Sequence, residues 1–334
     1  MTFWLQKQWL TYTPWHIVLL PISLIFLVIS SIRKWLYQNG WLKSYRLAVP
    51  VLVVGNINVG GSGKTPLVIW LAKQLQIAGY RPGIISRGYG GSGREVLAVF
   101  HHSDPQQVGD EPLLLARRTT CPVFVGADRV VAGEALLSAY PECNIIISDD
   151  GLQHYRLRRD VEIAVIDGKA GFGNGALLPA GPLREPVSRL KHVDAVVVNG
   201  KSKLNNILAL KPIEMVLQPA SFYNLLNPNE VCSVSNFAGK KVLAIAGIGN
   251  PQRFFQQLHH LGLKFQSKAY PDHYAFHSVD FAENVDDIVV MTEKDAVKCA
   301  GFAKPGFWVL PVSADIPPEL MAVVLNKLTN EEVI

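Results

Sequence analysis

The segment Val51–Pro66, with the sequence VLVVGNINVGGSGKTP, constrains the fold of this 334-residue chain more than any other feature. An apolar run leads into a glycine-rich turn, and Lys64 and Thr65 come directly before Pro66, a residue that favours the first turn of a helix. Such a P-loop surrounds phosphate oxygens with backbone N–H groups, while the lysine, a predicted catalytic residue, reaches the β- and γ-phosphates and the threonine binds Mg²⁺. The predicted phosphate-binding residues are Asn58, Val59, Gly60, Gly61, Ser62, Gly63, Lys64 and Thr65.

The loop departs at one position from the strict pattern G-x-x-x-x-G-K-[ST], which would place glycine where this chain has Asn58. Asparagine tolerates left-handed backbone better than most residues, and Gly60 and Gly61 add freedom. A structural turn with a chance GKT is the alternative, which the complete strand–loop–helix context disfavours. A second pattern, G-x-G-x-x-G at 88–93, precedes a segment that alternates like a strand, so we reject a dinucleotide site there.

Short apolar runs alternate with helix-like segments after residue 48. Runs that are apolar throughout are typical of parallel strands covered on both faces. Helix patterns lie at 66–78 and 128–139, the second with Asp128 as its predicted N-cap. The alternation predicts a doubly wound α/β sheet of the P-loop NTPase kind. The predicted strands are 49–54, 83–86, 122–126, 144–148, 162–166 and 194–199.

The N-terminal region contains a 19-residue run, Pro14–Ile32, without Asp, Glu, Lys or Arg. As a helix it would span about 28 Å, close to the ~30 Å hydrocarbon core of a bilayer. More basic residues follow the run than precede it, which places the main part of the chain in the cytoplasm. Tryptophans near both ends resemble interfacial anchors, and they are Trp4, Trp9, Trp15, Trp35 and Trp41.

Other interpretations of this run fit less well. A cleaved signal peptide would carry its charges before the run, whereas Arg33 and Lys34 follow it. A buried core helix would not be expected to carry five tryptophans and no acidic residue. An in-plane or half-inserted helix remains an alternative to a full span, because Pro21 disfavours a straight helix. Either form predicts attachment to a bilayer.

Residues 168–186, GKAGFGNGALLPAGPLREP, form a Gly/Pro-rich segment that is too long for a routine connection. Beyond about residue 230 the α/β pattern repeats on a smaller scale, with KVLAIAG, a helix near 251–261, DIVVMTEKDAVK and FWVLPVS. We therefore predict an N-terminal membrane-anchoring helix over 1–36, a P-loop domain over 37–228 and a smaller α/β domain over 229–334.

The net charge of +5 belongs to the first 50 residues, which hold five basic and no acidic side chains. The rest of the chain is balanced, so nucleic acid is not an expected partner. Charged residues make up only 18% of the chain, which excludes a disordered protein. The four cysteines form no C-x-x-C pair, which argues against a zinc site or a disulfide framework.

Two acidic residues, Asp149 and Asp150, end the apolar run NIIIS. Carboxylates at the carboxyl end of a strand beside a P-loop hold Mg²⁺ directly or through water. We therefore predict them as metal ligands together with Thr65. The alternative is that the two acids only cap a turn.

Asp110 and His273 are candidates with equally good structural explanations. Asp110 opens a predicted helix in VGDEP, where N-capping suffices as its role. His273 lies four residues before His277, but a zinc site would need a third ligand and a helix, whereas the preceding Pro-Asp pair indicates a loop. His273 either handles a proton or is a structural histidine.

Seven motifs follow one another in a fixed order behind the apolar N-terminus, and together they closely resemble the tetraacyldisaccharide 4′-kinase family of the lipid A pathway. The resemblance covers nearly the whole chain. It implies a two-lobed kinase that uses ATP and Mg²⁺ to phosphorylate the 4′-hydroxyl of an acylated glucosamine disaccharide 1-phosphate, giving lipid IVA on the cytoplasmic face of the inner membrane. The motifs are NVGGSGKTP, SRGYG, VGDEP, SDDGLQHY, LLPAGPLREP, AGIGNP and PDHY.

The same resemblance implies that Asp110 works with His273 on the sugar hydroxyl, and that residues 149–150 form the acidic motif. The chain has Leu152 and Gly91 where the family suggests Phe and a basic residue, and neither touches the predicted chemistry. No obligate protein partner is implied. The alternative of a different class is a membrane-tethered P-loop ATPase switch that acts on a protein partner and makes no phosphorylated product.

Overall fold

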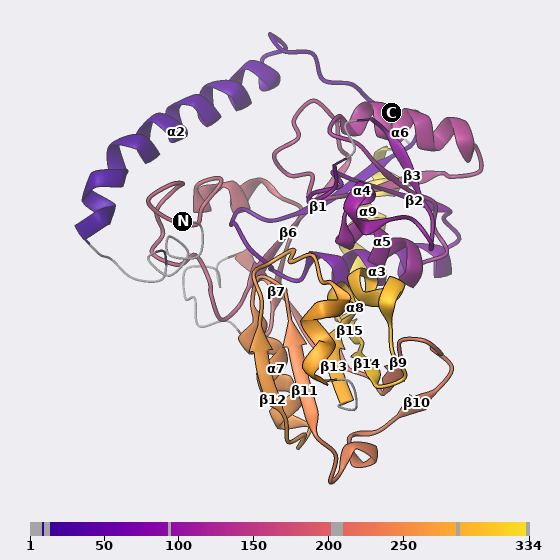
Figure 1. Cartoon of the computed structure of the whole chain (residues 1–334). Coiled ribbons are helices and arrows are strands. Elements are labelled where there is room, and N and C mark those ends of the chain that lie inside the picture. Colours follow the sequence, from indigo (N-terminus) through magenta and orange to yellow (C-terminus); the bar gives the residue numbers. More distant parts are fainter. Residues whose placement is uncertain (1–8, 10–13, 93–94, 202–209, 285–287, 332–334) are drawn as a thin grey trace.

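The computed structural model describes residues 9, 14–92, 95–201, 210–284 and 288–331. This part contains two β-sheets, and the larger has the strand order β15-β8-β7-β6-β1-β5-β2-β4-β3 (Figure 1). Its strands run parallel except the edge strands β3 and β15, which are antiparallel to their neighbours. The strands are β1 (Val51–Gly55), β2 (Pro82–Ser86), β3 (Leu97–Val99), β4 (Val123–Val125), β5 (Ile145–Asp149), β6 (Val161–Asp167), β7 (Ala195–Asn199), β8 (Ile213–Pro219) and β15 (Val312–Asp315).

Helices cover both faces of the larger sheet, because its central strands are apolar on both sides. Leu52 and Val54 of β1 belong to the core under α3, α5 and α9, while Val51 and Val53 belong to the core under α6. Burying each such side chain contributes about 1.5–3 kcal/mol. The predicted doubly wound sheet is confirmed. The helices are α3 (Lys64–Ile77), α4 (Pro105–Val108), α5 (Asp110–Arg118), α6 (Arg129–Ala139) and α9 (Glu319–Glu331).

The smaller sheet has the strand order β10-β9-β14-β13-β11-β12 and lies below the larger one in the view of Figure 1. Its inner strands β11, β13 and β14 are parallel and buried, and α7 and α8 flank them. The elements are β9 (Phe222–Asn224), β10 (Val231–Cys232), β11 (Val242–Ala246), α7 (Pro251–His260), β12 (Gln266–Ala269), β13 (Ile288–Thr292), α8 (Glu293–Cys299) and β14 (Phe307–Leu310).

The C-terminal segment does not follow the predicted division at 229. FWVLPVS, expected to belong to the α/β pattern of the smaller domain, is divided between two sheets, with β14 before Pro311 and β15 after it. Proline has no N–H to donate and therefore interrupts the ladder. β15 pairs antiparallel with β8, and α9 buries Leu320, Val324 and Leu328 in the core of the larger sheet. The smaller sheet thus occupies 222–310, and the chain then returns to the larger lobe.

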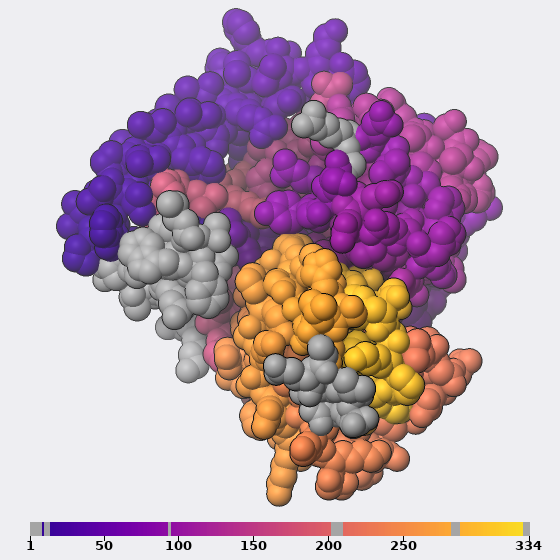
Figure 2. Space-filling model, in the orientation of Figure 1, coloured from indigo at the N-terminus to yellow at the C-terminus, as the bar shows by residue number. Residues whose placement is uncertain are grey.

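The N-terminal apolar run forms the 25-residue helix α2 (Pro14–Gln38), which lies along one side of the larger lobe (Figure 2). It continues through Pro21, and at about 1.5 Å per residue it is long enough to cross a bilayer. Large apolar side chains such as Ile17 and Ile25 are exposed along it. Of the predicted interfacial tryptophans, Trp4 lies outside the described residues.

One polar contact fixes α2 to the Gly/Pro-rich segment 168–186. The Ser23 hydroxyl donates to the Leu177 carbonyl at 3.0 Å and accepts from the Ala180 N–H at 3.0 Å. The indole N–H of Trp9 donates to the neighbouring Pro179 carbonyl at 3.0 Å. The long loop is therefore packed against the apolar helix.

Candidate active site

The carboxyl ends of β1, β5 and β2 meet at one edge of the larger sheet, because these strands are parallel neighbours. The P-loop follows β1, Asp149 ends β5, Asp150 comes next, and Ser86 ends β2. In open α/β sheets ligands bind outside such carboxyl ends. The structure therefore brings the predicted phosphate-binding and metal-binding residues together.

The turn of the P-loop is held by amide side chains. Asn56 donates to the Gly60 carbonyl and to the Ser62 hydroxyl, each at 3.3 Å, and Asn199 at the end of β7 donates to the Ser62 carbonyl at 3.0 Å. Gly63 has φ +96°, and a Cβ there would lie 2.3 Å from the Asn199 amide nitrogen. Position 63 therefore requires glycine for both its backbone conformation and its space.

Lys64 and Thr65 belong to the first turn of α3, which begins two residues earlier than the predicted start at Pro66. The backbone N–H groups of Gly61 and Gly63 make no hydrogen bond to other described residues. Together with the N-terminus of α3, these groups form a site suited to phosphate oxygens.

Two predicted phosphate-binding residues are engaged elsewhere. The Asn58 side chain donates to the Gly171 carbonyl at 2.6 Å, and the Val59 N–H donates to the Pro182 carbonyl at 2.8 Å. Both acceptors belong to segment 168–186. In this structure Asn58 and Val59 connect the P-loop to that segment, and the open N–H groups begin beyond them.

Asp150 is surrounded by cations. Its carboxylate lies 3.4 Å from Lys64 Nζ and 3.2 Å from Arg184 Nη1, and its backbone is left-handed with φ +50°. Burial raises the pKa of Asp150, but the charges of Lys64 and Arg184 outweigh it, and the pKa lies below its usual range. Arg184, a residue of segment 168–186, therefore pairs within the site.

Asp149 is the better candidate for a cation. Ser86 donates to its Oδ2 at 3.2 Å, whereas its Oδ1 is buried and has no hydrogen-bond partner among the described residues. Burial, together with the charge of Glu111, raises the pKa of Asp149 to about 7. A nucleotide-bound Mg²⁺ needs only one or two carboxylates, because phosphates and water complete its shell. The unpaired buried oxygen fits that requirement.

Asp110 and His273 form a pair across the two lobes. Asp110 is the first residue of α5, and both its carboxylate oxygens lie 3.0 Å from His273 Nδ1. His273 has a left-handed backbone with φ +59°, and the Tyr89 ring stands edge-on at 5.1 Å between centroids. Gly109 occupies the N-cap position, while Asp110 Oδ1 accepts from the Glu111 N–H at 2.9 Å, so the carboxylate contacts the helix start as well as His273. We refer to Asp110 and His273 as the dyad.

The dyad is electrostatically coupled. Burial raises the pKa of Asp110, but the hydrogen bond from His273 and the charge of Lys294 lower it by more. The pKa of Asp110 therefore lies below its usual range. Burial lowers the pKa of His273, and the hydrogen bond to Asp110 reverses this, leaving the pKa above its usual value. His277 is exposed, and the described residues contain no group of three or more His, Cys, Asp or Glu arranged for a metal.

Sequence reasoning missed two basic residues. Lys294 on α8 lies 3.0 Å from Glu111 and 3.9 Å from Asp110, and its place directly after an apolar strand was the available signal. Arg129, buried at the start of α6, lies 3.5 Å from the Asp150 carbonyl. A basic residue directly after an N-cap usually lies at the surface, so nothing in the sequence singled out Arg129.

The two residues that depart from the family pattern, Gly91 and Leu152, each fit tightly against their neighbours. A Cβ at Gly91 would lie 2.2 Å from the Gln107 carbonyl oxygen, so a side chain there requires the backbone to move. Leu152 is fully buried, and its side chain occupies the space where Gly55 would carry a Cβ. Neither position contacts the dyad.

The smaller lobe reaches the back of the P-loop. Arg253 on α7 contacts Asn199 Oδ1 at 2.5 Å and Asp167 Oδ2 at 3.2 Å, at the ends of β7 and β6. A Cβ at Gly249 would lie 3.2 Å from the Gly61 nitrogen. The lobes thus meet at the P-loop as well as at the dyad.

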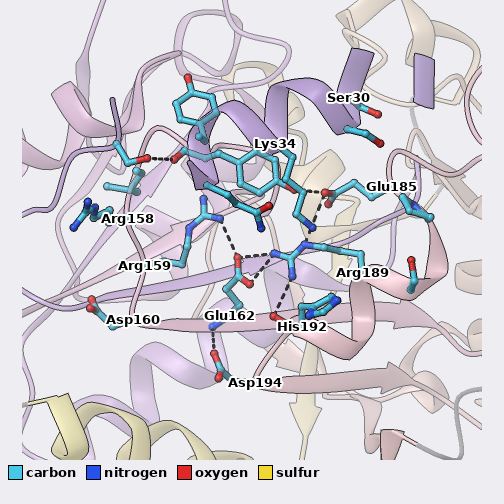
Figure 3. A pocket seen from close by; sticks show the side chains of 18 of the residues that line it. Ser30, Lys34, Arg158, Arg159, Asp160, Glu162, Glu185, Arg189, His192 and Asp194 are labelled. Atoms are coloured by element: carbon cyan, nitrogen blue, oxygen red, sulfur yellow. Dashed lines mark hydrogen bonds and ion pairs between the residues drawn. The ribbon is translucent and has the colours of Figure 1, made fainter. Parts of the chain in front are cut away.

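A cavity of about 810 Å³ lies apart from this site, between the second half of α2 and the amino end of β6 (Figure 3). Its charged walls are internally paired: Arg189 contacts Glu162 at 2.6 Å, and Arg159 contacts the same carboxylate at 2.9 Å. No predicted site residue lines it.

The comparisons with known proteins agree with the motif order. The family model of tetraacyldisaccharide-1-P 4′-kinase matches residues 15–329. A tetraacyldisaccharide 4′-kinase of Methylobacillus flagellatus is 52% identical over 98% of this chain and 96% of its own length. That of Pasteurella multocida is 48% identical over 98% of both chains.

A solved structure shows the same fold. The crystal structure of an "apo" form of LpxK from Aquifex aeolicus in complex with ATP has a TM-score of 0.78 and 30% sequence identity, and it covers 94% of this chain and 99% of its own. The family expected from the motifs is thereby confirmed: the chain belongs to the tetraacyldisaccharide 4′-kinase family.

Proposed function

We propose that this chain transfers the γ-phosphate of ATP to the 4′-hydroxyl of a tetraacyldisaccharide 1-phosphate, giving lipid IVA. The observation that carries the proposal is the buried carboxylate of Asp110, held 3.0 Å from His273 close to the P-loop: a Cβ at Gly249 would lie 3.2 Å from both the Gly61 nitrogen and Oδ2 of Asp272, the residue before His273. Family membership supports the acceptor, and the ATP complex of the Aquifex aeolicus relative supports the nucleotide.

Each group has a defined role at the phosphates. The N–H groups beyond Val59 bind the phosphate oxygens, and Lys64 stabilises the charge that develops on the leaving ADP. Thr65 and Asp149 would hold Mg²⁺, with Asp150 neutralised by Lys64 and Arg184. The cation would supply neutralisation of the phosphate charge.

The proton of the acceptor goes to Asp110. As the 4′-oxygen forms its bond to the γ-phosphorus, the bond from that phosphorus to the β–γ bridging oxygen breaks, and the hydroxyl proton moves to an Asp110 carboxylate oxygen. His273 orients this carboxylate. Because the two residues come from different lobes, apposition of the lobes completes the site.

The helix α2 supports attachment to the inner membrane, with both lobes on its cytoplasmic face. Its exposed apolar side chains match a bilayer, and a substrate with several acyl chains does not leave one, at about 0.8 kcal/mol per buried CH₂. Deleting residues 1–33 is expected to lower activity on bilayer-held substrate by about tenfold or more, and activity on detergent-dispersed substrate much less. Equal losses in both assays would contradict the anchoring role.

A direct assay tests the function. ATP labelled at the γ-phosphate is offered with the acylated disaccharide 1-phosphate, and the label is located in the product. Label at the 4′-position supports the kinase. Steady ATP hydrolysis without a labelled lipid, stimulated by a protein, would favour the ATPase switch, an alternative that the family relationship does not support.

A further inference from the structure

Lys294 lies where four polar side chains of the two lobes converge. Its Nζ is 3.0 Å from Glu111 Oε1, 3.3 Å from Asp272 Oδ1, 3.4 Å from His273 Nε2 and 3.9 Å from Asp110 Oδ2. Its side chain is only 16% exposed. Lys294 is therefore a cation that contacts both members of the dyad.

The sequence around Lys294 fixes α8 in place. Thr292 caps the helix by accepting from the Asp295 N–H at 3.2 Å, and its hydroxyl donates to Asp295 Oδ2 at 2.7 Å. Glu293 pairs with Arg118 at the far end of α5. With residues 292, 293 and 295 so engaged, Lys294 projects from a rigid helix end.

The contact with His273 determines where the imidazole proton resides. A lysine ammonium has donors only, so Nε2, 3.4 Å away, must accept. The ring proton is then on Nδ1, where it donates to Asp110 at 3.0 Å. A doubly protonated ring would direct an N–H group at the ammonium.

We propose that Lys294 is a positioning residue for phosphoryl transfer, which opposes the imidazolium that Asp110 favours, so that the neutral ring of His273 carries its proton on Nδ1, and which keeps the Asp110 carboxylate ionised and aimed at the acceptor. The catalytic part of this inference rests on the proposed function, whereas the tautomer does not. The step itself is unchanged: Asp110 takes the proton, and Lys294 touches neither substrate nor reacting atoms.

Removing the ammonium leaves an acidic surrounding for the ring. Asp272 Oδ2 lies 3.8 Å from Nε2, on the opposite nitrogen from Asp110, and its charge would then act on Nε2 without the opposing ammonium. A carboxylate there favours the imidazolium. Charged groups that act on the dyad include Asp272 from the loop that carries His273, and Lys294 and Lys298 from α8, while Glu111 from α5 pairs with Lys294.

Nitrogen-15 NMR of the histidines in the full-length protein, without nucleotide or lipid, tests the tautomer, with His273→Gln for assignment. In the wild type at high pH we expect a protonated Nδ1 and an unprotonated Nε2. Lys294→Met should raise the pKa of His273 by about one unit, and Asp272→Asn should lower it. Lys264→Met, which removes an exposed lysine of the same lobe, should leave it unchanged. An unaltered titration in Lys294→Met, or an Nε2–H tautomer in the wild type, would overturn the proposal.

Kinetics tests the consequence for the reaction. Lys294→Met is expected to lower kcat by about 10- to 100-fold, change the KM for ATP less than twofold, and move the acid limb of the pH profile upward. Lys294→Arg, which retains the charge, should recover part of kcat and of the profile.

A wild type that makes no phosphorylated disaccharide refutes the proposed function alone, because the NMR result stands independently. An active Lys294→Met with wild-type kcat and pH profile refutes the role of Lys294. If Lys294→Met does not fold, the proposal is tested with Asp272→Asn and Lys294→Arg. An unchanged pKa of His273 in Asp272→Asn, together with a wild-type pH profile in Lys294→Arg, would then contradict it.

Discussion

The two halves of the candidate site are built differently. The phosphate half comes from one continuous segment, in which Gly63 fixes the turn and Lys64 opens the helix behind it. The acceptor half takes Asp110 from the larger lobe and His273 and Lys294 from the smaller one. The first is held by backbone geometry and neutral amides, the second by charges that meet across an interface. We therefore expect nucleotide binding to persist when the lobes are loosened, and transfer to fail.

Asp110→Asn should give the largest effect and separate the two halves most clearly. The amide keeps the size of the side chain but does not accept the hydroxyl proton, so kcat should fall by about 10²–10⁴ while the KM for ATP changes little. Steady-state kinetics with the acylated disaccharide measures both constants. Turnover near the wild-type value would remove Asp110 from the reaction.

Gly63→Ala should damage the phosphate half instead. Its φ of +96° and the 2.3 Å approach to Asn199 leave no room for a methyl group. Backbone strain of about 1–3 kcal/mol corresponds to a loss of ATP affinity of roughly 5- to 150-fold. Titration with an ATP analogue measures it, and Gly79→Ala provides the matched control, because a Cβ there meets no neighbour although φ is also positive. Equal affinities in the two variants would show that the contact with Asn199 does not matter.

Arg253→Gln is expected to act more weakly and mainly on the acceptor half. The partly exposed pairing with Asp167 contributes about 0–1 kcal/mol, which corresponds to at most about fivefold. Because this contact joins the lobes, kcat with the lipid acceptor should fall more than affinity for the nucleotide. Parallel kinetic and binding measurements decide, and a loss confined to nucleotide binding would contradict the expectation.

The pH dependence of stability should show the smallest effect and sharpen the assignment of Asp149. Its pKa of about 7 in the folded chain exceeds the ordinary carboxyl value of about 4, so the folded state holds a proton that the unfolded state has released. Without nucleotide, this group should therefore lower the melting temperature by a few degrees as pH rises from about 4 to 7. Asp149→Asn should flatten that part of the profile, and Mg²⁺ with an ATP analogue should reduce it. An identical slope in Asp149→Asn would refute the shifted pKa.

Local signals predicted the strand, turn and helix of the phosphate half. The strand, glycine-rich turn and lysine lie within a few residues, and short-range geometry decides their structure. Engagement of Val59 by Pro182 was not predictable, since it depends on how a loop more than 100 residues away packs. The return of residues 312–331 to the larger sheet was not predicted for the same reason, because the sequence of a strand does not show which sheet the strand joins.

The acceptor half was reached through resemblance more than through chemistry. Residue types alone left Asp110 as an N-cap candidate and His273 as a structural histidine. Their contact spans 163 positions in the sequence, and sequence reasoning did not single out Lys294. Only tertiary structure shows that these charges neutralise one another.

The contact of Ser23 with segment 168–186 has a mechanical consequence. That segment joins helix α2 on one side and, through Gly171 and Pro182, the P-loop on the other. Under the proposed attachment to a bilayer, the depth of α2 in the lipid would set the height of the P-loop above the membrane surface. A sugar hydroxyl at the level of its own acyl chains would then meet the nucleotide only at one depth of the helix.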